Sequence, residues 1–189
     1  MAKQHRALQR QPSTDKEGRD MRFERVSLSA FMDDVRKHYS ESMRAEDIMA
    51  AWNNIKIPER KTKYSAGYDI CCPLDISIGP HSKIVVPTGI RAVFAPEEME
   101  SWHLQMYVRS SVGIKDEVML SNNTGVIDPD YFQGLNEGDM MLALFNTGDN
   151  LVQYKAGDRL CQAVFVLHGI TIDDKATGQR IGGLGSTNT

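Results

Sequence analysis

The sequence has few cysteines, no long apolar run and no excess of positive charge. Its three cysteines are Cys71, Cys72 and Cys161. Neighbours in sequence rarely pair and no CxxC spacing is present, so neither a disulfide framework nor a zinc site of that kind is expected. Reduced thiols are typical of a cytoplasmic protein. No apolar run reaches about 18 residues, so no membrane segment is expected, and the N-terminus lacks the apolar stretch of a secretory signal.

The charge balance is slightly acidic. The chain has 22 Lys and Arg residues against 25 Asp and Glu residues, a net charge of −3. A protein that binds polymeric nucleic acid by neutralising phosphates is usually basic, so that class of partner is not expected. The 189 residues fit one domain with an appendage. An apolar content of 41% indicates a globular chain rather than collagen, a coiled coil or disorder.

The N-terminal part divides into an arm and a helical extension. Residues 1–20 are polar without apolar periodicity, and we expect a flexible arm. Residues 21–54 are expected to be a short helical extension that packs on the domain or on a neighbouring subunit. Its first helix begins at a Ser27 cap and its second is short and precedes Pro58. The apolar positions of the two helices are Leu28, Phe31, Met32, Val35 and Tyr39, then Ile48, Met49 and Trp52.

Residues 55–172 have a period of two and predict an all-β barrel or sandwich. Glycine, proline, asparagine and aspartate separate short β-rich runs. The predicted runs are 68–72, 75–78, 83–86, 89–94, 102–108, 118–121, 140–145, 151–154 and 160–167. The tail, residues 173–189, is rich in glycine and lacks a periodic core pattern.

Two early segments could bind an anion. Residues 65–69 place a glycine before the start of a strand that carries Asp69; this could simply be a turn and is weak evidence alone. Arg109, Ser110 and Ser111 follow a predicted strand. A planar guanidinium and two hydroxyls suit phosphate oxygens, although a surface ion pair with a serine cap is the alternative.

Three later segments add an acid, an aromatic ring and a glycine-rich tail. Residues 122–134 predict a hairpin, in which Asp128 could orient or deprotonate a water and Tyr131 could lie on a sugar or base. An Asp-Pro turn and a core tyrosine are the alternatives. Residues 157–162 are a turn leading into a strand, and residues 180–187 could wrap a ligand or be a disordered end.

In this order the segments resemble the motifs of the trimeric dUTPase family. The matching stretches are AGYD at 66–69, RSS at 109–111, GVIDPDY at 125–131, GDRLCQ at 157–162 and RIGGLGST at 180–187. The resemblance covers about residues 55–189, and the longer 133–139 segment resembles a phage and Firmicutes branch. It implies a jelly-roll β-barrel of the β-clip type that assembles as a homotrimer. The active sites would lie at subunit junctions, with the C-terminal motif closing as a lid from another subunit.

The resemblance also implies a role for each matching residue. Asp128 would activate the water that attacks the α-phosphorus of dUTP, and Asp69 would hold Mg2+ through water. The uracil and deoxyribose contacts would come from Asn122, Gly125, Ile127, Tyr131 and Leu184. The phosphate contacts would come from Arg109, Ser110, Ser111, Gln162, Arg180, Gly185, Ser186 and Thr187.

The sequence departs from the family pattern at Leu184, Ile181, Cys161 and Pro129, and two competing functions remain. Leu184 stands where most members have phenylalanine over the uracil, a loss of stacking on the order of 1 kcal/mol. The related dCTP deaminases have a catalytic glutamate where this chain has Ala143, so deamination is disfavoured. The remaining alternative is a regulatory protein that binds a repressor-type partner, with residues 21–54 and 133–139 as candidate surfaces and with weak or absent hydrolysis.

Overall fold

The computed structural model describes residues 20–180 and 182, and its architecture is mainly β. The strands are β1 (Arg22–Arg25), β2 (Tyr68–Cys71), β3 (Ile76–Ile78), β4 (Lys83–Pro87), β5 (Ile90–Val93), β6 (Trp102–Val108), β7 (Val118–Leu120), β8 (Gly125–Ile127), β9 (Met141–Asn146), β10 (Val152–Tyr154) and β11 (Arg159–Leu167). The helices are α1 (Leu28–Asp34), α2 (Ala45–Asn53) and α3 (Ser110–Ile114), with a π-helix η1 (Val35–Tyr39) and 3-10 helices η2 (Pro96–Glu98) and η3 (Tyr131–Gln133).

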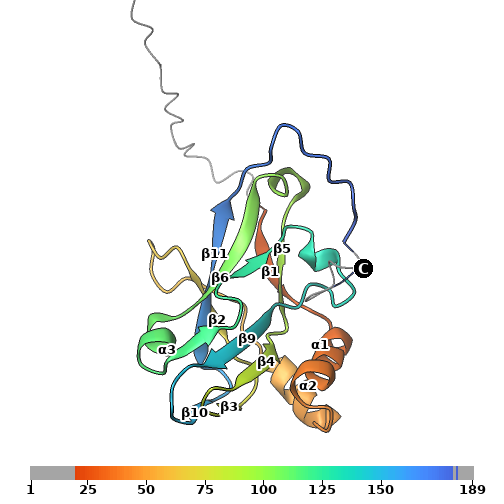
Figure 1. Cartoon of the computed structure of the whole chain (residues 1–189). Helices are drawn as coiled ribbons and strands as arrows, with labels where there is room; N and C mark the ends of the chain where they lie inside the picture. The colour runs from red at the N-terminus through yellow and green to blue at the C-terminus, as the bar shows by residue number, and fades with distance from the viewer. Residues whose placement is uncertain (1–19, 181, 183–189) are drawn as a thin grey trace, which may run out of the picture.

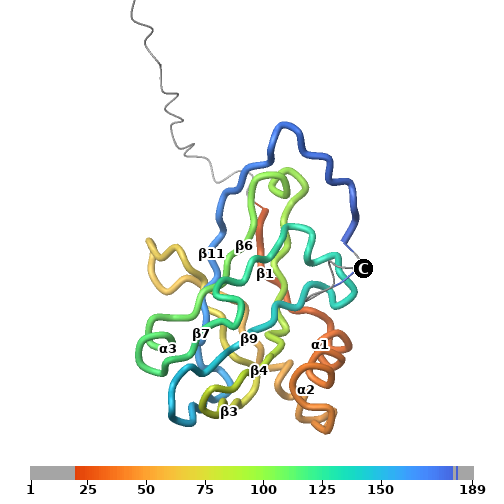
Figure 2. Tube along the Cα trace, in the orientation of Figure 1, coloured from red at the N-terminus to blue at the C-terminus, as the bar shows by residue number. Residues whose placement is uncertain are grey.

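The strands form four antiparallel sheets around a shared core. The larger sheets have the orders β2-β11-β6-β8 and β4-β9-β7, and the smaller ones pair β1 with β5 and β10 with β3. Helices α1 and α2 lie together beside β4 and β9 (Figure 1). The chain after β11 arches over the end of the sheets and returns beside the turn that follows β8 (Figure 2). Among the described residues, no helix combines the length and apolarity needed to cross a membrane.

The predicted strands are confirmed, whereas one expected helical segment and one expected hairpin are not. Every β-rich run predicted from the sequence overlaps a strand. Residues 22–25, which we expected to belong to a helical extension, instead form β1 and pair with β5. The hairpin predicted over 122–134 is not formed, because β8 pairs with β6 and the preceding β7 pairs with β9. The short α3 was expected only as part of a turn. Such short elements depend on tertiary pairing, because their length leaves too little local pattern to read.

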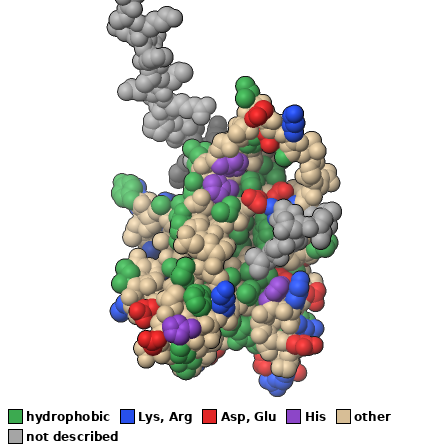
Figure 3. Space-filling model, viewed as in Figure 1, with side chains coloured by type: hydrophobic (Ala, Val, Ile, Leu, Met, Phe, Trp, Pro, Cys, Tyr) green, Lys and Arg blue, Asp and Glu red, His purple; other side chains and the backbone are tan. Residues whose placement is uncertain are grey.

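The helices pack onto the sheets through the predicted apolar face. Ser27 caps α1 as expected, since its Oγ accepts a hydrogen bond from the Ala30 N–H at 3.2 Å. Phe31, Val35 and Ile48 are fully buried. The predicted first helix continues to its expected end, but as the π-helix η1. Acidic and basic side chains gather over the outer face of this helical layer (Figure 3).

Gly89 lets the helical layer approach the turn between β4 and β5. Its φ is +68°, and a Cβ there would lie 2.2 Å from Ile55 Cδ1 and 3.1 Å from Phe31 Cδ2. The Val26 N–H also donates to the Gly89 carbonyl at 3.0 Å. The residues before the barrel therefore share its core.

The substitution Gly89→Ala tests this packing. We expect it to lower the free energy of unfolding by about 1–2 kcal/mol from φ strain and by a further ~1–3 kcal/mol from overpacking. Gly157→Ala is the matched control, because Gly157 has φ +95° and no atom lies within 4 Å of the place its new methyl group would take. Urea unfolding measures both variants. Equal losses would contradict close packing of the helices on this turn.

Candidate functional site

Strand β11 brings three of the predicted motifs together. Gln162 lies opposite Asp69 of β2 on one side and opposite Tyr107 of β6 on the other. The Arg109 N–H donates to the Leu160 carbonyl at 2.9 Å, which fixes the end of β6 against β11. The result is a polar cavity of about 430 Å³ lined by Lys61, Ser65, Gly67, Asp69, Arg109, Ser110, Ser111, Arg159 and Gln162. We call this cavity the phosphate pocket.

Asp69 holds two arginines at the phosphate pocket. Its Oδ1 lies 3.2 Å from Arg109 Nε, and its Oδ2 accepts a hydrogen bond from Arg159 Nη1 at 2.7 Å. The Asp69 side chain is only 15% exposed. A largely buried carboxylate between two guanidinium groups leaves one net positive charge, which suits an anion.

The serines of the pocket stand at the start of α3. Arg109 is the residue before this helix, and Ser110 and Ser111 form its first turn. The first N–H groups of a helix have no partner within it. Both serines therefore offer a hydroxyl together with a backbone donor at the edge of the pocket.

The absence of a side chain at Gly67 leaves room for the Gln162 side chain. A Cβ on Gly67 would lie 2.8 Å from Gln162 Oε1 and 3.2 Å from Gln162 Cβ. A side chain at this position would make the Gln162 carboxamide shift, so the glycine before β2 leaves the carboxamide in its present place. The AGYD and GDRLCQ segments therefore lie in close contact.

Asp128 lies far from the phosphate pocket within one chain. Ile127 of β8 pairs with Leu104 of β6, so Asp128 follows opposite His103. Arg109 is six residues further along than His103, a distance of about 20 Å in an extended strand. The structure thus brings together Asp69, Arg109 and Gln162 but not Asp128.

Arg180 contacts the acids of its own chain. Its Nη2 contacts Asp128 Oδ2, and its Nε donates to Asp130 Oδ1 at 2.8 Å. Its guanidinium carbon also lies 5.5 Å from the centroid of the Tyr131 ring, a cation–π distance. Arg180, predicted to bind phosphate, here covers the predicted catalytic acid and the sugar-binding ring.

The residues predicted to contact the nucleoside lie on β8 and in the turns on either side of it. Gly125 and Ile127 are buried, and Asn122 is exposed in the turn between β7 and β8. Tyr131 is only 7% exposed, and its hydroxyl donates to the Asp139 carbonyl at 3.2 Å. Burial raises the pKa of Tyr131 above its usual range. The ring is thus anchored in the core at one end while Arg180 lies over its face.

Other predicted residues lie outside the part of the chain that the structure describes. These are Leu184, Gly185, Ser186 and Thr187.

Comparison with known proteins assigns the family. A sequence profile of the dUTPase family matches residues 53–187. The chain belongs to the dUTPase family. A deoxyuridine 5'-triphosphate nucleotidohydrolase of Lactococcus lactis is 36% identical over 77% of this chain and 97% of that protein. The protein of the same name from Wolinella succinogenes is 30% identical over 71% of this chain and 87% of that protein.

Solved structures agree with the fold. The dUTPase of Streptococcus mutans aligns with a TM-score of 0.60 and 28% identity over 80% of this chain and 98% of that chain. A dUTPase from phage phi11 of S. aureus aligns with a TM-score of 0.55 and 22% identity over 66% of this chain and 91% of that chain. At 22% identity the phage structure supports the fold alone.

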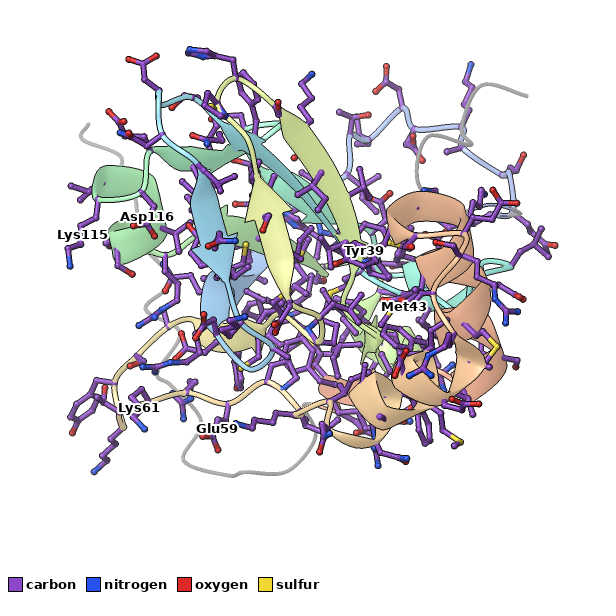
Figure 4. All side chains as sticks on the ribbon, turned by 90° about the horizontal axis from the view of Figure 1, so that it is seen from below. Tyr39, Met43, Glu59, Lys61, Lys115 and Asp116 are labelled. Atoms are coloured by element: carbon purple, nitrogen blue, oxygen red, sulfur yellow. The ribbon has the colours of Figure 1, made fainter. Side chains whose placement is uncertain are left out.

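Two cations of the pocket, Lys61 and Arg159, were not predicted as site residues of this dUTPase family member. Lys61 precedes the AGYD segment, and Arg159 lies in the predicted turn at 157–162. Figure 4 shows Lys61 with Glu59 on the loop between α2 and β2, away from the helical layer that carries Tyr39. The basic stretch from Arg60 to Lys63 was the available signal.

A divalent cation fits the pocket only in company with a phosphate ligand. Among residues 20–180 and 182, no group of three or more His, Cys, Asp or Glu side chains converges to hold a metal. Magnesium commonly keeps several waters and binds through one or two carboxylates plus substrate phosphates. Asp69 Oδ2 accepts one hydrogen bond from Arg159, and Oδ1 lies in an ion pair with Arg109, so the carboxylate retains lone pairs that suit a metal-bound water.

Asp139 lies between η3 and β9 and is fully buried. Its Oδ1 accepts hydrogen bonds from the Gly89 N–H at 2.8 Å and the Thr88 N–H at 3.2 Å. Its Oδ2 has no hydrogen-bond partner among the described residues. Burial, with the nearby charge of Asp34, raises the pKa of Asp139 well above its ordinary value.

The substitution Asp139→Asn tests this raised pKa. Above about pH 4, where an unfolded aspartate ionises, the folded wild type keeps the proton and unfolding releases it. Its stability therefore falls with pH by up to about 1.4 kcal/mol per pH unit until the folded pKa is reached. Asparagine does not titrate, so the variant should gain on the wild type as pH rises from 4 to 8 in urea unfolding.

The control is Gly157→Ala, which removes no titratable group, so its difference from the wild type should stay flat over the same pH range. A pH-independent difference at Asp139 would contradict the raised pKa.

Proposed function

We propose that this chain hydrolyses dUTP to dUMP and pyrophosphate, and so keeps uracil out of DNA and supplies dUMP. The observation that carries the proposal is the phosphate pocket at the β2-β11-β6 edge. It is built from the segments that align with a deoxyuridine 5'-triphosphate nucleotidohydrolase over 97% of that protein. Ala143 of β9 stands where the deaminases need a glutamate, so this position has no carboxylate for deamination.

Asp128 acts as the base in this proposal. It orients a water and accepts its proton as the oxygen attacks the α-phosphorus of dUTP. The bond from that phosphorus to the bridging oxygen breaks, and the negative charge passes to the leaving pyrophosphate. The Asp128 side chain is 51% exposed, so water reaches it once Arg180 moves aside.

The phosphate pocket binds the triphosphate. Arg109 and Gln162 supply side-chain donors, and the first turn of α3 supplies backbone and hydroxyl donors. Such fixed donors stabilise charge as it develops on the leaving group. Magnesium bound with the triphosphate supplies further charge neutralisation on its oxygens. Asp69 would contact that ion through water.

The complete site requires more than one copy of the chain. Asp128 and Arg109 are about 20 Å apart along β6, whereas a general base must come within about 3 Å of its water beside the phosphate. In the homotrimer that the family resemblance implies, β8 and Asp128 of one copy would lie over the phosphate pocket of another.

The first test measures pyrophosphate release with magnesium from dUTP, dCTP, dTTP and UTP. Wild type should release pyrophosphate far faster from dUTP than from the other three nucleotides, and Asp128→Asn should turn over about 10²–10⁴-fold more slowly with dUTP affinity retained. Asp149→Asn is the matched control and should be unchanged. Undiminished turnover in Asp128→Asn would overturn its role. No release from any nucleotide by the wild type would favour a regulatory protein with a repressor-type partner.

The second test asks whether the site is shared between copies. Arg109→Ala and Asp128→Asn should each be inactive alone, and co-expression of the two should restore a measurable fraction of activity. Rescue occurs because some junctions then combine an intact Asp128 with an intact Arg109 from another copy. A co-expressed mixture as inactive as either variant would show that one chain carries the whole site.

A further inference from the structure

The turn that follows Asp128, residues 129–139, contacts the helical layer of α1, η1 and α2 at both ends of α1. Ser27 precedes α1 and Asp34 ends it. Each contacts one of two neighbouring residues of the turn, Glu137 and Asn136. Both ends of α1 therefore contact the same short stretch of the turn, residues 136–137.

The contact at the start of α1 is the stronger of the two. Ser27 Oγ donates to Glu137 Oε1 at 2.6 Å, and the Ser27 N–H donates to Glu137 Oε2 at 2.9 Å. The same Ser27 Oγ accepts from the Ala30 N–H, so one hydroxyl both caps the helix and binds the turn. Hydrogen bonds to a carboxylate are about twice as strong as neutral ones. Arg91, which is also paired with Glu24 of β1, lies 3.8 Å from Glu137.

The contact at the end of α1 reaches the hydroxyl of Tyr131. Asn136 Nδ2 lies 3.4 Å from Asp34 Oδ2 and donates to the Asp139 carbonyl at 3.3 Å. The Tyr131 hydroxyl donates to that same carbonyl. Asn136 and Tyr131 therefore share one acceptor.

The backbone between these contacts is tightly constrained. Glu137 and Gly138 both have positive φ, +55° and +78°. A Cβ on Gly138 would lie 2.4 Å from Phe132 Cα, so the returning chain is pressed against η3. A shift of residues 136–138 toward η3 must therefore move that helix, which carries Tyr131.

We propose that Ser27, Asn136 and Glu137 are positioning residues that fix Tyr131, so that the helical layer sets the discrimination between a deoxyribose and a ribose. The inference rests on the proposed function and on the deoxyribose contact that the family resemblance implies for Tyr131. Rejection of a 2′-hydroxyl by steric fit depends on the place of the ring to a fraction of an ångström. A loosened ring admits the hydroxyl at little energetic cost.

The principal variants are Ser27→Ala and Glu137→Gln, with Ser27→Thr as the conservative rescue. Ser27→Ala removes the hydroxyl that binds Glu137, and threonine restores it. We expect the ratio of kcat/KM for dUTP to that for UTP to fall about tenfold in the first two variants, within the range that small misplacements cost. Ser27→Thr should keep the wild-type ratio.

The ratio separates positioning from stability. A merely structural role lowers the amount of active protein, which reduces both substrates equally and leaves the ratio unchanged. Tyr39→Phe is the matched control, because it removes another bond from the helical layer to the barrel, the 2.5 Å hydrogen bond from the Tyr39 hydroxyl to the Asp75 carbonyl. Its ratio should equal that of the wild type. An unchanged ratio in Ser27→Ala would overturn the proposal.

Hydrogen exchange tests the coupling without any activity. Amides of residues 131–139 should exchange faster in Ser27→Ala than in the wild type, whereas those of 118–127 should not change. Equal exchange at 131–139 would overturn the proposal even if dUTP is hydrolysed. Faster exchange in a protein that hydrolyses no nucleotide would refute the proposed function and leave the coupling of α1 to the turn supported.

Discussion

The pairing of β11 with both β2 and β6 is the constraint on which the site depends. It places Gln162 opposite Asp69 and beside Tyr107, at the end of β6 where Arg109 begins α3. Three segments that are far apart in sequence thereby share one pocket. Because backbone ladder hydrogen bonds define this register, a slip of one residue would turn every side chain of β11 to the other face.

The same strand β6 also keeps the reacting groups apart. Its pairing with β8 leaves Asp128 opposite His103, near one end, while Arg109 stands at the other. Burial and the neighbouring His168 lower the pKa of His103, so this end of the strand favours a neutral imidazole beside the acid. In the proposed function each copy therefore carries only half of the site, and assembly would complete it.

Arg180 shows how such a half-site can be protected. In the single chain the guanidinium pairs with Asp128 and Asp130 and covers Tyr131. A charge-assisted contact of this kind satisfies two acids that would otherwise face each other across a short turn. The carbonyl of Gly182 continues along the same turn, 3.2 Å from where a Cβ on Gly134 would lie. The C-terminal segment thus occupies the nucleoside side of its own chain.

The sequence by itself determined the β-rich runs, the Ser27 cap and the apolar face of the first helix, because these follow from local periodicity and chemistry. Its motifs also pointed to the dUTPase family, through residue types in a fixed order. Only the tertiary structure decided that residues 22–25 are a strand, that Lys61 lines the pocket, and that Asp128 stands apart from Arg109. Each of these depends on strand register or on loop placement across the sheets. Long-range pairing sets both, and no local pattern encodes them.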